Sequence, residues 1–491
     1  MGRHSDYGNG MYRQIQEIMG RLESMEKELK DEKKEHKEDV CRLNDKIRGM
    51  EKKLEDKDRQ IRILTDENER LKRRLNNDST NSSMPPSSDR PVKPANHYNG
   101  REKSGKKPGG QKGHKGTTLT KKDVEEKIRS GKFLHKVETL GTPCGVYRTK
   151  YILDLEIVPV IREIRIYRDH IKGSLEQQYR PAVSYGPNIK AMAVDLYAEG
   201  VMSNDRICSF LNTVSGNALA LSEGSVYGFC KDLSRKCSLY IGKPEEELLG
   251  EKTVCTDATV VTVNGKQAYI RNASTGNAVL YYAMESKGKE ALDKIGFFTR
   301  FAGTLEHDHE TALYHYGSGH GECNVHLLRY LKKNTEEAGS SWAGELAGEL
   351  CRMNEERKEL MGKGERSFSK EKIEAYERRY DEILKEGWEQ NHKTRGRLAG
   401  QEERTLLRRL EKYKENHLLF LHDFAVPFEN NLSERDLRKC KNRQKMSGGF
   451  RKVSGIEMYC AILSIVETCK RKGIQVLDTI KKIFEGTPAI F

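Results

Sequence analysis

The sequence lacks the features of secreted and membrane-spanning chains. It contains no run of about 18 apolar residues, and its first residues, MGRHSDYGNGMYRQ, carry no apolar signal-peptide core. Its eleven cysteines are scattered, with no Cys-x-x-Cys pair, an arrangement typical of reduced thiols and not of a disulfide framework. We therefore expect a cytoplasmic protein with free thiols and no membrane partner.

Positive charge is in excess. The 491 residues include 88 Lys+Arg against 74 Asp+Glu, a formal net charge of +14. A chain of this length allows about two to four domains at roughly 150 residues each. The excess indicates a polyanionic partner, nucleic acid in preference to a membrane surface.

Residues 11–76 predict one long helix with an apolar seam. Apolar residues recur at spacings of three and four, with a single one-residue shift, and most intervening positions are charged, as in a coiled coil. The seam consists of Ile15, Ile18, Leu22, Met25, Leu29, Val40, Leu43, Ile47, Met50, Leu54, Ile61, Leu64, Asn68, Leu71 and Leu75. A homo-oligomer is the simplest interpretation, with Asn68 setting register, and pairing with another protein stays open.

Residues 77–120 favour a disordered basic linker. The segment 77–88 is polar and rich in helix breakers, and residues 90–116 contain eight lysines and arginines against one acid. Such an arm can follow a phosphate backbone and release its counterions; a merely solubilising linker is the alternative. The candidate DNA-binding residues here are Lys103, Lys106, Lys107, Lys112 and Lys115.

Residues 121–180 predict a small β-rich module. The stretches 151–160 and 161–167 alternate or run apolar and β-branched on either side of Pro159. Cys144 is the only cysteine of this region, too few for a structural zinc site.

Residues 185–245 predict short helices that begin near Ser203 and Ser222. This is the outline of a helix-turn-helix, although ordinary core helices give the same pattern.

Residues 250–338 predict a mixed sheet. Strands are expected over 252–263, 267–271 and 277–284, with a turn at Asn264 and Gly265, a crossover helix over 288–300, and a fourth strand that ends at Asp308. This order resembles a ribonuclease H-like core, in which the first and fourth strands are neighbours. Asp257 and Asp308 are then expected to lie together, and a buried aspartate is costly unless its charge is used.

A third acid, Glu434, lies in a strongly basic helical run over 427–451. Asn430, Asn431 and Ser433 offer side chains for an N-cap, and Ser447 with the two following glycines ends the helix. A solvated amphipathic helix is the alternative. The candidate DNA-binding residues of this run are Arg435, Arg438, Lys441, Arg443, Lys445 and Arg451.

Three clustered carboxylates suit two Mg²⁺ or Mn²⁺ ions, which can drive in-line phosphoryl displacement. His326 and Arg329 lie one helical turn apart and are further candidates for DNA contact, with simple packing nearly as well supported. Cys323 with His326 makes only half of a zinc site, and no zinc is expected. Residues 339–422 predict an all-α insertion, and 423–491 the C-terminal helices that carry Glu434.

Blocks of the sequence resemble the DDE transposases of the bacterial insertion-sequence family sixty-six, in that family's order. The blocks are the coiled coil, the segment 81–89, GGQKGHKG at 109–116, TDAT at 256–259, Asp308 ahead of Tyr314, CNVHLLR at 323–329, NNLSERDLR at 430–438 and SGGF at 447–450. The resemblance implies that Asp257, Asp308 and Glu434 are a catalytic metal-binding triad. It also implies that the partners are the element's DNA ends and the target DNA.

The sequence departs from that family's pattern at two places. Only Cys144 stands where members often carry a cysteine-rich zinc-binding module, and Ala258 replaces a glutamate in the first block. Because Ala258 would point to the opposite face from Asp257, the triad is expected to survive.

Three functions compete on the sequence alone. The leading one is a metal-dependent DNA strand transferase, with the need for accessory proteins left open. The others are a DNA-binding coiled-coil protein with an inactive or unused core, and a metal-dependent nuclease that does not rejoin strands.

Overall fold

The computed structural model describes residues 5–76, 120–131, 134–138, 149–153, 155, 157–166, 180–392 and 398–487. It is a mixed α/β structure, mostly helical, and it divides into two compact units, residues 1–89 and 90–491. Across these ranges, no helix combines the length and the apolar character that crossing a membrane requires.

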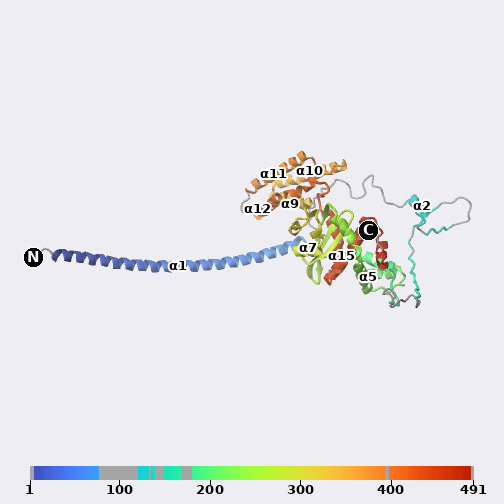
Figure 1. Cartoon of the computed structure of the whole chain (residues 1–491), viewed down its shortest axis with the longest axis horizontal. Helices are drawn as coiled ribbons and strands as arrows, with labels where there is room; N and C mark the ends of the chain where they lie inside the picture. Colours follow the sequence, from blue (N-terminus) through green and yellow to red (C-terminus); the bar gives the residue numbers. More distant parts are fainter. Residues whose placement is uncertain are drawn as a thin grey trace. The chain divides into compact units, whose positions relative to one another are not determined.

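The first unit is the single helix α1 (Ser5–Asn76), drawn as one uninterrupted rod in Figure 1. The helix predicted for this region is confirmed. The seam side chains that the structure describes, between Ile15 and Leu64, face solvent: Leu22 is 55% exposed, Met25 66% and Leu54 64%. An apolar stripe of this length favours a partner helix, and the coiled coil itself stays a prediction.

The β-rich module is wrong for the described part of residues 121–180. The structure places one helix there, α2 (Lys121–Arg129), begun by a capping box between Thr120 and Asp123. Residues 134–138, 149–153, 155 and 157–166 form no strand, and Leu155 and Ile161 are 80% and 97% exposed. Alternation defines a face, but a strand also needs a paired neighbour and something to cover that face. The five lysines predicted to bind DNA in the basic arm lie outside the described residues.

Short helices occupy residues 187–249, where the sequence predicted a helical region over 185–245. They are α3 (Pro187–Ala198), α4 (Asn204–Val214), α5 (Glu223–Cys237) and α6 (Gly242–Leu249). Both predicted starts are confirmed, because Ser203 Oγ accepts from Arg206 N and Ser222 Oγ accepts from Ser225 N. The buried apolar side chains of α3, α4 and α5 join one hydrophobic core with the C-terminal helices, and Leu248 of α6 packs in another. DNA recognition by these helices stays a prediction.

A six-stranded mixed sheet follows. Its strands are β1 (Thr253–Cys255), β2 (Ala258–Val263), β3 (Lys266–Ser274), β4 (Val279–Met284), β5 (Thr304–His307) and β6 (Gly319–Glu322). β1 and β2 run along the same edge of β3 in one register, with Cys255 opposite Ser274 and Ala258 opposite Arg271. They are therefore the single predicted strand, interrupted at residues 256 and 257.

The remaining pairings complete the sheet. β4 pairs with the other edge of β3, while β5 lies parallel to β1 and β6 parallel to β5. The predicted crossover is confirmed as α7 (Lys289–Ile295) and α8 (Phe297–Arg300). β6 was missed, because its sequence Gly-His-Gly-Glu has no β-branched residue and its backbone pairing with β5 alone makes it a strand.

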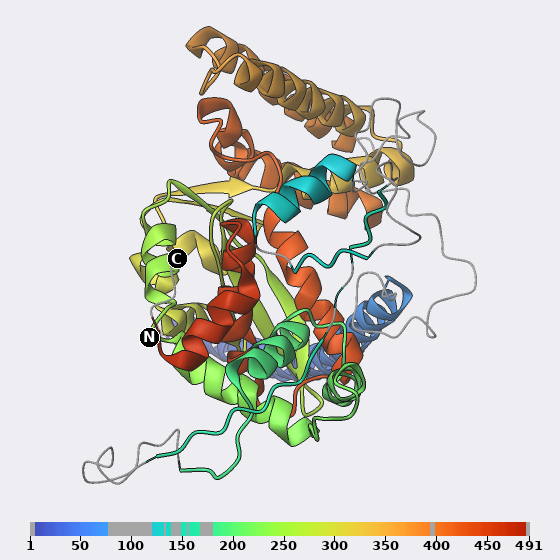
Figure 2. The same ribbon diagram turned by 90° about the vertical axis from the view of Figure 1, so that its right-hand side faces the viewer.

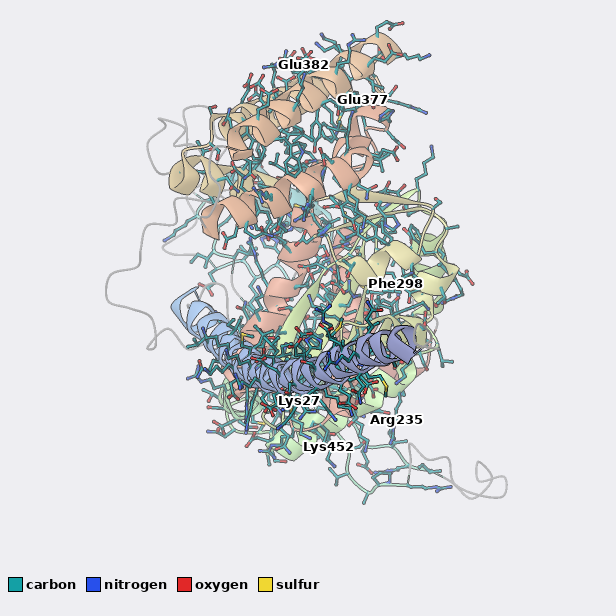
Figure 3. All side chains as sticks on the ribbon, turned by 90° about the vertical axis from the view of Figure 1, so that its left-hand side faces the viewer. Lys27, Arg235, Phe298, Glu377, Glu382 and Lys452 are labelled. Atoms are coloured by element: carbon teal, nitrogen blue, oxygen red, sulfur yellow. The ribbon has the colours of Figure 1, made fainter. Side chains whose placement is uncertain are left out.

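The segment predicted as an all-α insertion is helical. Its helices, over residues 339–422, are α10 (Ser341–Gly362), α11 (Lys370–His392), α12 (Leu398–Lys412) and α13 (Lys414–His422), and α9 (Asn324–Ala338) precedes them and packs with them. They surround a core of their own that includes Trp342, Tyr380 and Leu407. Figure 2 shows this helical lobe in ochre and orange beyond one end of the sheet, and Figure 3 shows Glu377 and Glu382 on its outer surface.

Three helices close the chain: α14 (Asn431–Ser447), α15 (Val453–Arg471) and α16 (Val476–Glu485). α15 covers the outer edge of β4. Ser464 Oγ and Thr468 Oγ1 accept hydrogen bonds from Tyr281 N and Val279 N, at 2.9 and 3.2 Å. Side-chain hydroxyls thus satisfy edge amides that would otherwise invite pairing with another strand.

Buried polar contacts of Asp436 hold α14 on the sheet. Its carboxylate accepts from Ser274 Oγ and from Arg471 Nη2, each at 2.5 Å. Arg471 also donates to the carbonyl of Ala278 at 2.7 Å, so one ion pair joins α14, α15 and β3.

We expect Asp436→Ala to destabilise the protein by about 3 kcal/mol, because it leaves the largely buried Arg471, whose side chain is 12% exposed, without its counter-ion. Chemical denaturation followed by circular dichroism measures the loss. Arg435→Ala, at the neighbouring exposed position of α14, is the matched control and should change stability by less than about 0.5 kcal/mol. Equal stability of the two variants would contradict the role given to Asp436.

Candidate active site

The backbone of Asp257 is fixed at the break between β1 and β2. Its N–H donates to Asn272 Oδ1 at 3.0 Å, and its carbonyl accepts from Asn272 N at 3.1 Å. Its own Oδ1 accepts from Ala258 N at 2.6 Å. Regular strand pairing therefore stops at Asp257, and the side chain and backbone of Asn272 hold Asp257 in place.

The parallel register brings Asp308 next to Asp257. Cys255 stands opposite Glu306 in the parallel β1–β5 ladder. Asp257 follows two residues after Cys255, and Asp308 follows two residues after Glu306. Burial, reinforced by the charge of Asp308, raises the pKa of Asp257 to about 6. A like charge has this effect only at short range, so the predicted meeting of these two aspartates is supported by register and by electrostatics.

His326 connects the second aspartate to the third acid. Its Nδ1 lies 3.2 Å from Asp308 Oδ1, and its Nε2 lies 3.7 Å from Glu434 Oε1. Burial alone would lower the pKa of His326, but the contact with Asp308 and the charge of Glu434 outweigh it and raise that pKa. His326 thus lies between two of the three acids, and its position favours the charged form of the imidazole.

The start of α14 is docked by the side chains that were predicted to cap it. The helix begins where expected, at Asn431, but Asn430 makes no side-chain cap. Its Nδ2 donates instead to the carbonyl of Thr256 at 2.9 Å, and Ser433 Oγ donates to Asn272 Oδ1 at 2.5 Å. These bonds tie the first turn of α14, and with it Glu434, to the strand break that carries Asp257.

Comparison with known families now places the chain. The model of the Transposase IS66 family matches residues 182–458, more than half of the sequence, and the match contains all three acids. The chain belongs to this family. A second model, of a family of unknown function, matches residues 11–120, and no curated protein matches the chain. Membership confirms the resemblance drawn from the sequence blocks and supports transposase function in general, with DNA as partner.

Transposases of this kind generally use divalent metal ions, and the residues present fit such ions. Carboxylate oxygens are the ligands that Mg²⁺ and Mn²⁺ prefer. Asp308 Oδ1 is buried and has no hydrogen-bond partner by geometry among the described residues, with His326 Nδ1 at 3.2 Å as its charged neighbour. An acceptor left in this state suits a cation.

Cys323 joins this cluster from the junction of β6 with α9. Ligand atoms of Asp308, Cys323 and His326 all lie within 4.8 Å of one another, and Cys323 Sγ accepts a hydrogen bond from Asn430 N at 3.3 Å. The sequence alone gave two potential ligands here, and β6 brings Asp308 to them as a third. Arg329, one turn beyond His326, is half-buried, and its charge acts to lower the pKa of His326.

A second polar cluster, centred on Glu322, joins the helical lobe to the sheet. The buried carboxylate accepts from Tyr314 Oη and, at 2.7 Å, from Arg409 Nη2. It also lies 3.0 Å from His309 Nδ1 and 3.2 Å from His417 Nε2. Burial would raise the pKa of Glu322, but these partners keep it well below its ordinary value. Sequence reasoning missed Glu322, because β6 itself was missed.

The basic residues of α14 separate into two groups. Arg435 and Arg438 are exposed, as is Arg451 beyond the helix, and Lys441 and Lys445 are half-buried. Arg443 is different: only 6% exposed, it lies 4.1 Å from the ring centroid of Tyr197 and donates to the carbonyl of Met202. The prediction that Arg443 binds DNA is therefore corrected. The regular spacing of charges along the run concealed the face that packs on α3.

A fully buried carboxyl, Glu306, lies two residues before Asp308 on the same face of β5. Neither of its oxygens has a hydrogen-bond partner among the described residues. Burial, with the charges of Asp308 and Glu322 adding to it, raises the pKa of Glu306 well above its usual range. Gly321 on β6 leaves room for it: a Cβ there would overlap Glu306 Oε2 and lie 2.9 Å from Val426 Cγ1.

We expect Gly321→Ala to destabilise the protein by about 1–3 kcal/mol, because the added methyl group overpacks a closed site. Gly348→Ala is the matched control: this glycine lies inside α10 with open space around it, and alanine should stabilise the helix by up to about 1 kcal/mol. Thermal unfolding of both variants gives the comparison. Destabilisation of equal size in both would show that close packing at Gly321 is not the cause.

Proposed function

We propose that the chain is a DDE transposase, which cuts an insertion element from DNA and joins it elsewhere with the help of two Mg²⁺ or Mn²⁺ ions. Asp257, Asp308 and Glu434 would hold these ions. The observation that carries the proposal is the position of Asp308, which is coupled to Asp257 through the β1–β5 register and to Glu434 through His326.

The proposed fold of this region is ribonuclease H-like. Three antiparallel strands (β4, β3 and the β1–β2 ribbon) are followed by two strands parallel to β1, in the spatial order β4, β3, β1, β5, β6. We propose the core as residues 250–338 and 423–491, with the α-helical insertion at 339–422. The coiled coil at 11–76, the basic linker at 77–120 and the helical domain at 185–245 are the proposed accessory regions.

The residues of the chain have separable tasks in such a reaction. Two metal ions bound at the acids would activate a water or a 3′-hydroxyl and stabilise the leaving oxygen of an in-line displacement. Asn272, Asn430 and Ser433 hold two of the acids at a fixed separation. His326 balances the charge of Asp308 and Glu434 before DNA arrives, and it stands where a phosphate oxygen would approach, with Arg329 one turn away.

DNA would bind along the exposed face of α14. Arg435 and Arg438 are one turn apart, directly beyond Glu434, and exposed. Lys441, Lys445 and Arg451 continue the charge toward the end of the helix. The five lysines of the basic arm would add contacts that are independent of sequence. The exposed seam of α1 is the proposed homo-oligomer contact, by which two element ends would be held by one assembly.

Two other functions are compatible with this family membership. A DNA-binding protein with an unused core would bind element ends and never cut them. A nuclease would cut without joining. The cluster of three acids, with a buried aspartate oxygen free of hydrogen bonds, favours metal-dependent chemistry over binding alone.

We expect Asp257→Asn and Glu434→Gln each to reduce cleavage and joining about 100-fold or more, since even groups that only orient a metal ligand contribute 10–100-fold. The assay is strand cleavage and joining on a labelled duplex carrying the element's ends, with Mg²⁺ or Mn²⁺. Glu429→Gln is the matched control, because this glutamate is exposed and lies five residues before Glu434.

Each outcome of this assay selects one function. Joined products that disappear in both variants and persist in the control establish the transferase. Cleavage without joining in the native chain favours the nuclease. Tight binding of the ends by all four proteins, with no cleavage by any of them, indicates a DNA-binding protein. Equal loss of activity in Glu429→Gln would show that the losses in Asp257→Asn and Glu434→Gln are not specific to the triad.

We further expect Arg435→Ala and Arg438→Ala to weaken DNA binding by a similar factor for every sequence. Each should reduce the slope of log K against log salt by about 0.9, the value for one lost phosphate contact on duplex DNA. Fluorescence anisotropy between low and moderate salt measures the slope. Lys243→Ala, which removes an exposed charge on α6, should leave it unchanged; an equal change there would mean that only the net charge matters.

A further inference from the structure

The three ligand atoms near the acid cluster differ from those of a magnesium site. Asp308 directly follows β5, while Cys323 and His326 lie one turn apart at the start of α9, and the ligand atoms of all three lie within 4.8 Å of one another. One carboxylate, one thiol and one imidazole are offered. Thiolate and imidazole are ligands of Zn²⁺ and similar cations, whereas Mg²⁺ takes oxygen ligands.

The geometry is close to that of a bound cation. With metal–ligand distances of about 2.0 to 2.3 Å, the ligand atoms of a tetrahedral zinc site stand roughly 3.3 to 3.8 Å apart. Side-chain rotations that draw the three atoms together by about 1 Å would reach this spacing. Three protein ligands leave a fourth position for a water or a phosphate oxygen.

Burial and the charge of Asp308 raise the pKa of the Cys323 thiol, and a bound cation would have to offset that effect, whereas one backbone contact already favours the thiolate. Its Sγ already accepts a hydrogen bond from Asn430 N at 3.3 Å, a contact that would orient and stabilise the charged sulfur. On binding, the S–H bond breaks, the sulfur forms a bond to the cation, and the proton leaves to solvent. No oxidant or reductant is needed.

We infer that Asp308, Cys323 and His326 form a site for a thiophilic divalent cation of the Zn²⁺ class. This site shares Asp308 with the proposed catalytic set, so the two kinds of cation compete for one carboxylate, and Zn²⁺ inhibits the reaction that Mg²⁺ supports. The binding stands independently of the catalytic proposal, whereas the inhibition rests on it.

Cadmium provides a spectroscopic test of the binding. The full chain is freed of metal with a chelator and titrated with Cd²⁺, and thiolate-to-cadmium charge-transfer absorption is followed in the ultraviolet. Cys41 and Cys351, the exposed cysteines among those described, are replaced by serine in all proteins to lower the background. One equivalent of absorption is expected, displaced by Zn²⁺ and not by a large excess of Mg²⁺.

Variants locate the signal. Cys323→Ser should abolish the absorption, and His326→Ala should weaken Cd²⁺ binding at least tenfold. Cys255→Ser is the matched control: this cysteine is buried on the neighbouring strand β1, and it is not among the three ligands. Circular dichroism confirms that each variant is folded. Absorption that persists in Cys323→Ser, or its absence from the native chain, overturns the inference.

Activity separates this inference from the proposed function. Asp257→Asn should lose strand joining yet keep the cadmium absorption. If the native chain shows the absorption but never cuts DNA, the cation site stands and the catalytic proposal fails. If it cuts DNA without the absorption, the reverse holds. In the presence of Mg²⁺, the Zn²⁺ concentration that halves activity should be at least tenfold lower for the native chain than for Cys323→Ser, with each protein compared with its own activity without Zn²⁺. Equal inhibition of the two proteins would overturn the proposal that Zn²⁺ competes at Asp308.

Discussion

The parallel pairing of β1 with β5 is the constraint on which the site depends. It places two aspartates at adjacent strand ends, where burial and like charge oppose their joint ionisation and raise the pKa of Asp257 to about 6. That arrangement is costly unless a cation compensates it. His326 supplies part of the positive charge between Asp308 and Glu434. The need for a cation is therefore a consequence of strand register before any metal is considered.

Polar contacts, more than apolar ones, place the third acid. α14 carries few apolar residues, and Leu437 and Cys440 are those it buries. Its position is instead set by Asp436 with Arg471, and by Asn430 and Ser433, whose partners lie around the strand break. Such bonds are directional. A helix docked in this way can keep a basic, exposed face for DNA and still hold one carboxylate at a defined position.

The parts of the fold that local patterns specify were predictable. The three antiparallel strands, the crossover, the helix starts at Ser203 and Ser222, and the helical lobe all follow from periodicity and capping. The parts set by partners were not: β6 is a strand only because β5 pairs with it, and the described residues of 151–160 form no strand because none of the other described residues pairs with them. Arg443 is buried against Tyr197 for the same reason, since the charge pattern of α14 does not reveal which face meets α3.

The missed strand also explains why the sequence concealed the chemistry of Cys323. From sequence, Cys323 and His326 are two ligands on one helix, and two ligands do not make a site. β6 pairs with β5 and so brings the start of α9 beside the end of β5. Asp308 then lies between the carboxylates of the proposed triad and the thiol and imidazole of Cys323 and His326. One carboxylate cannot serve a hard and a soft cation at once with full coordination. We therefore propose that the ligands combined with Asp308 decide which class of cation binds there.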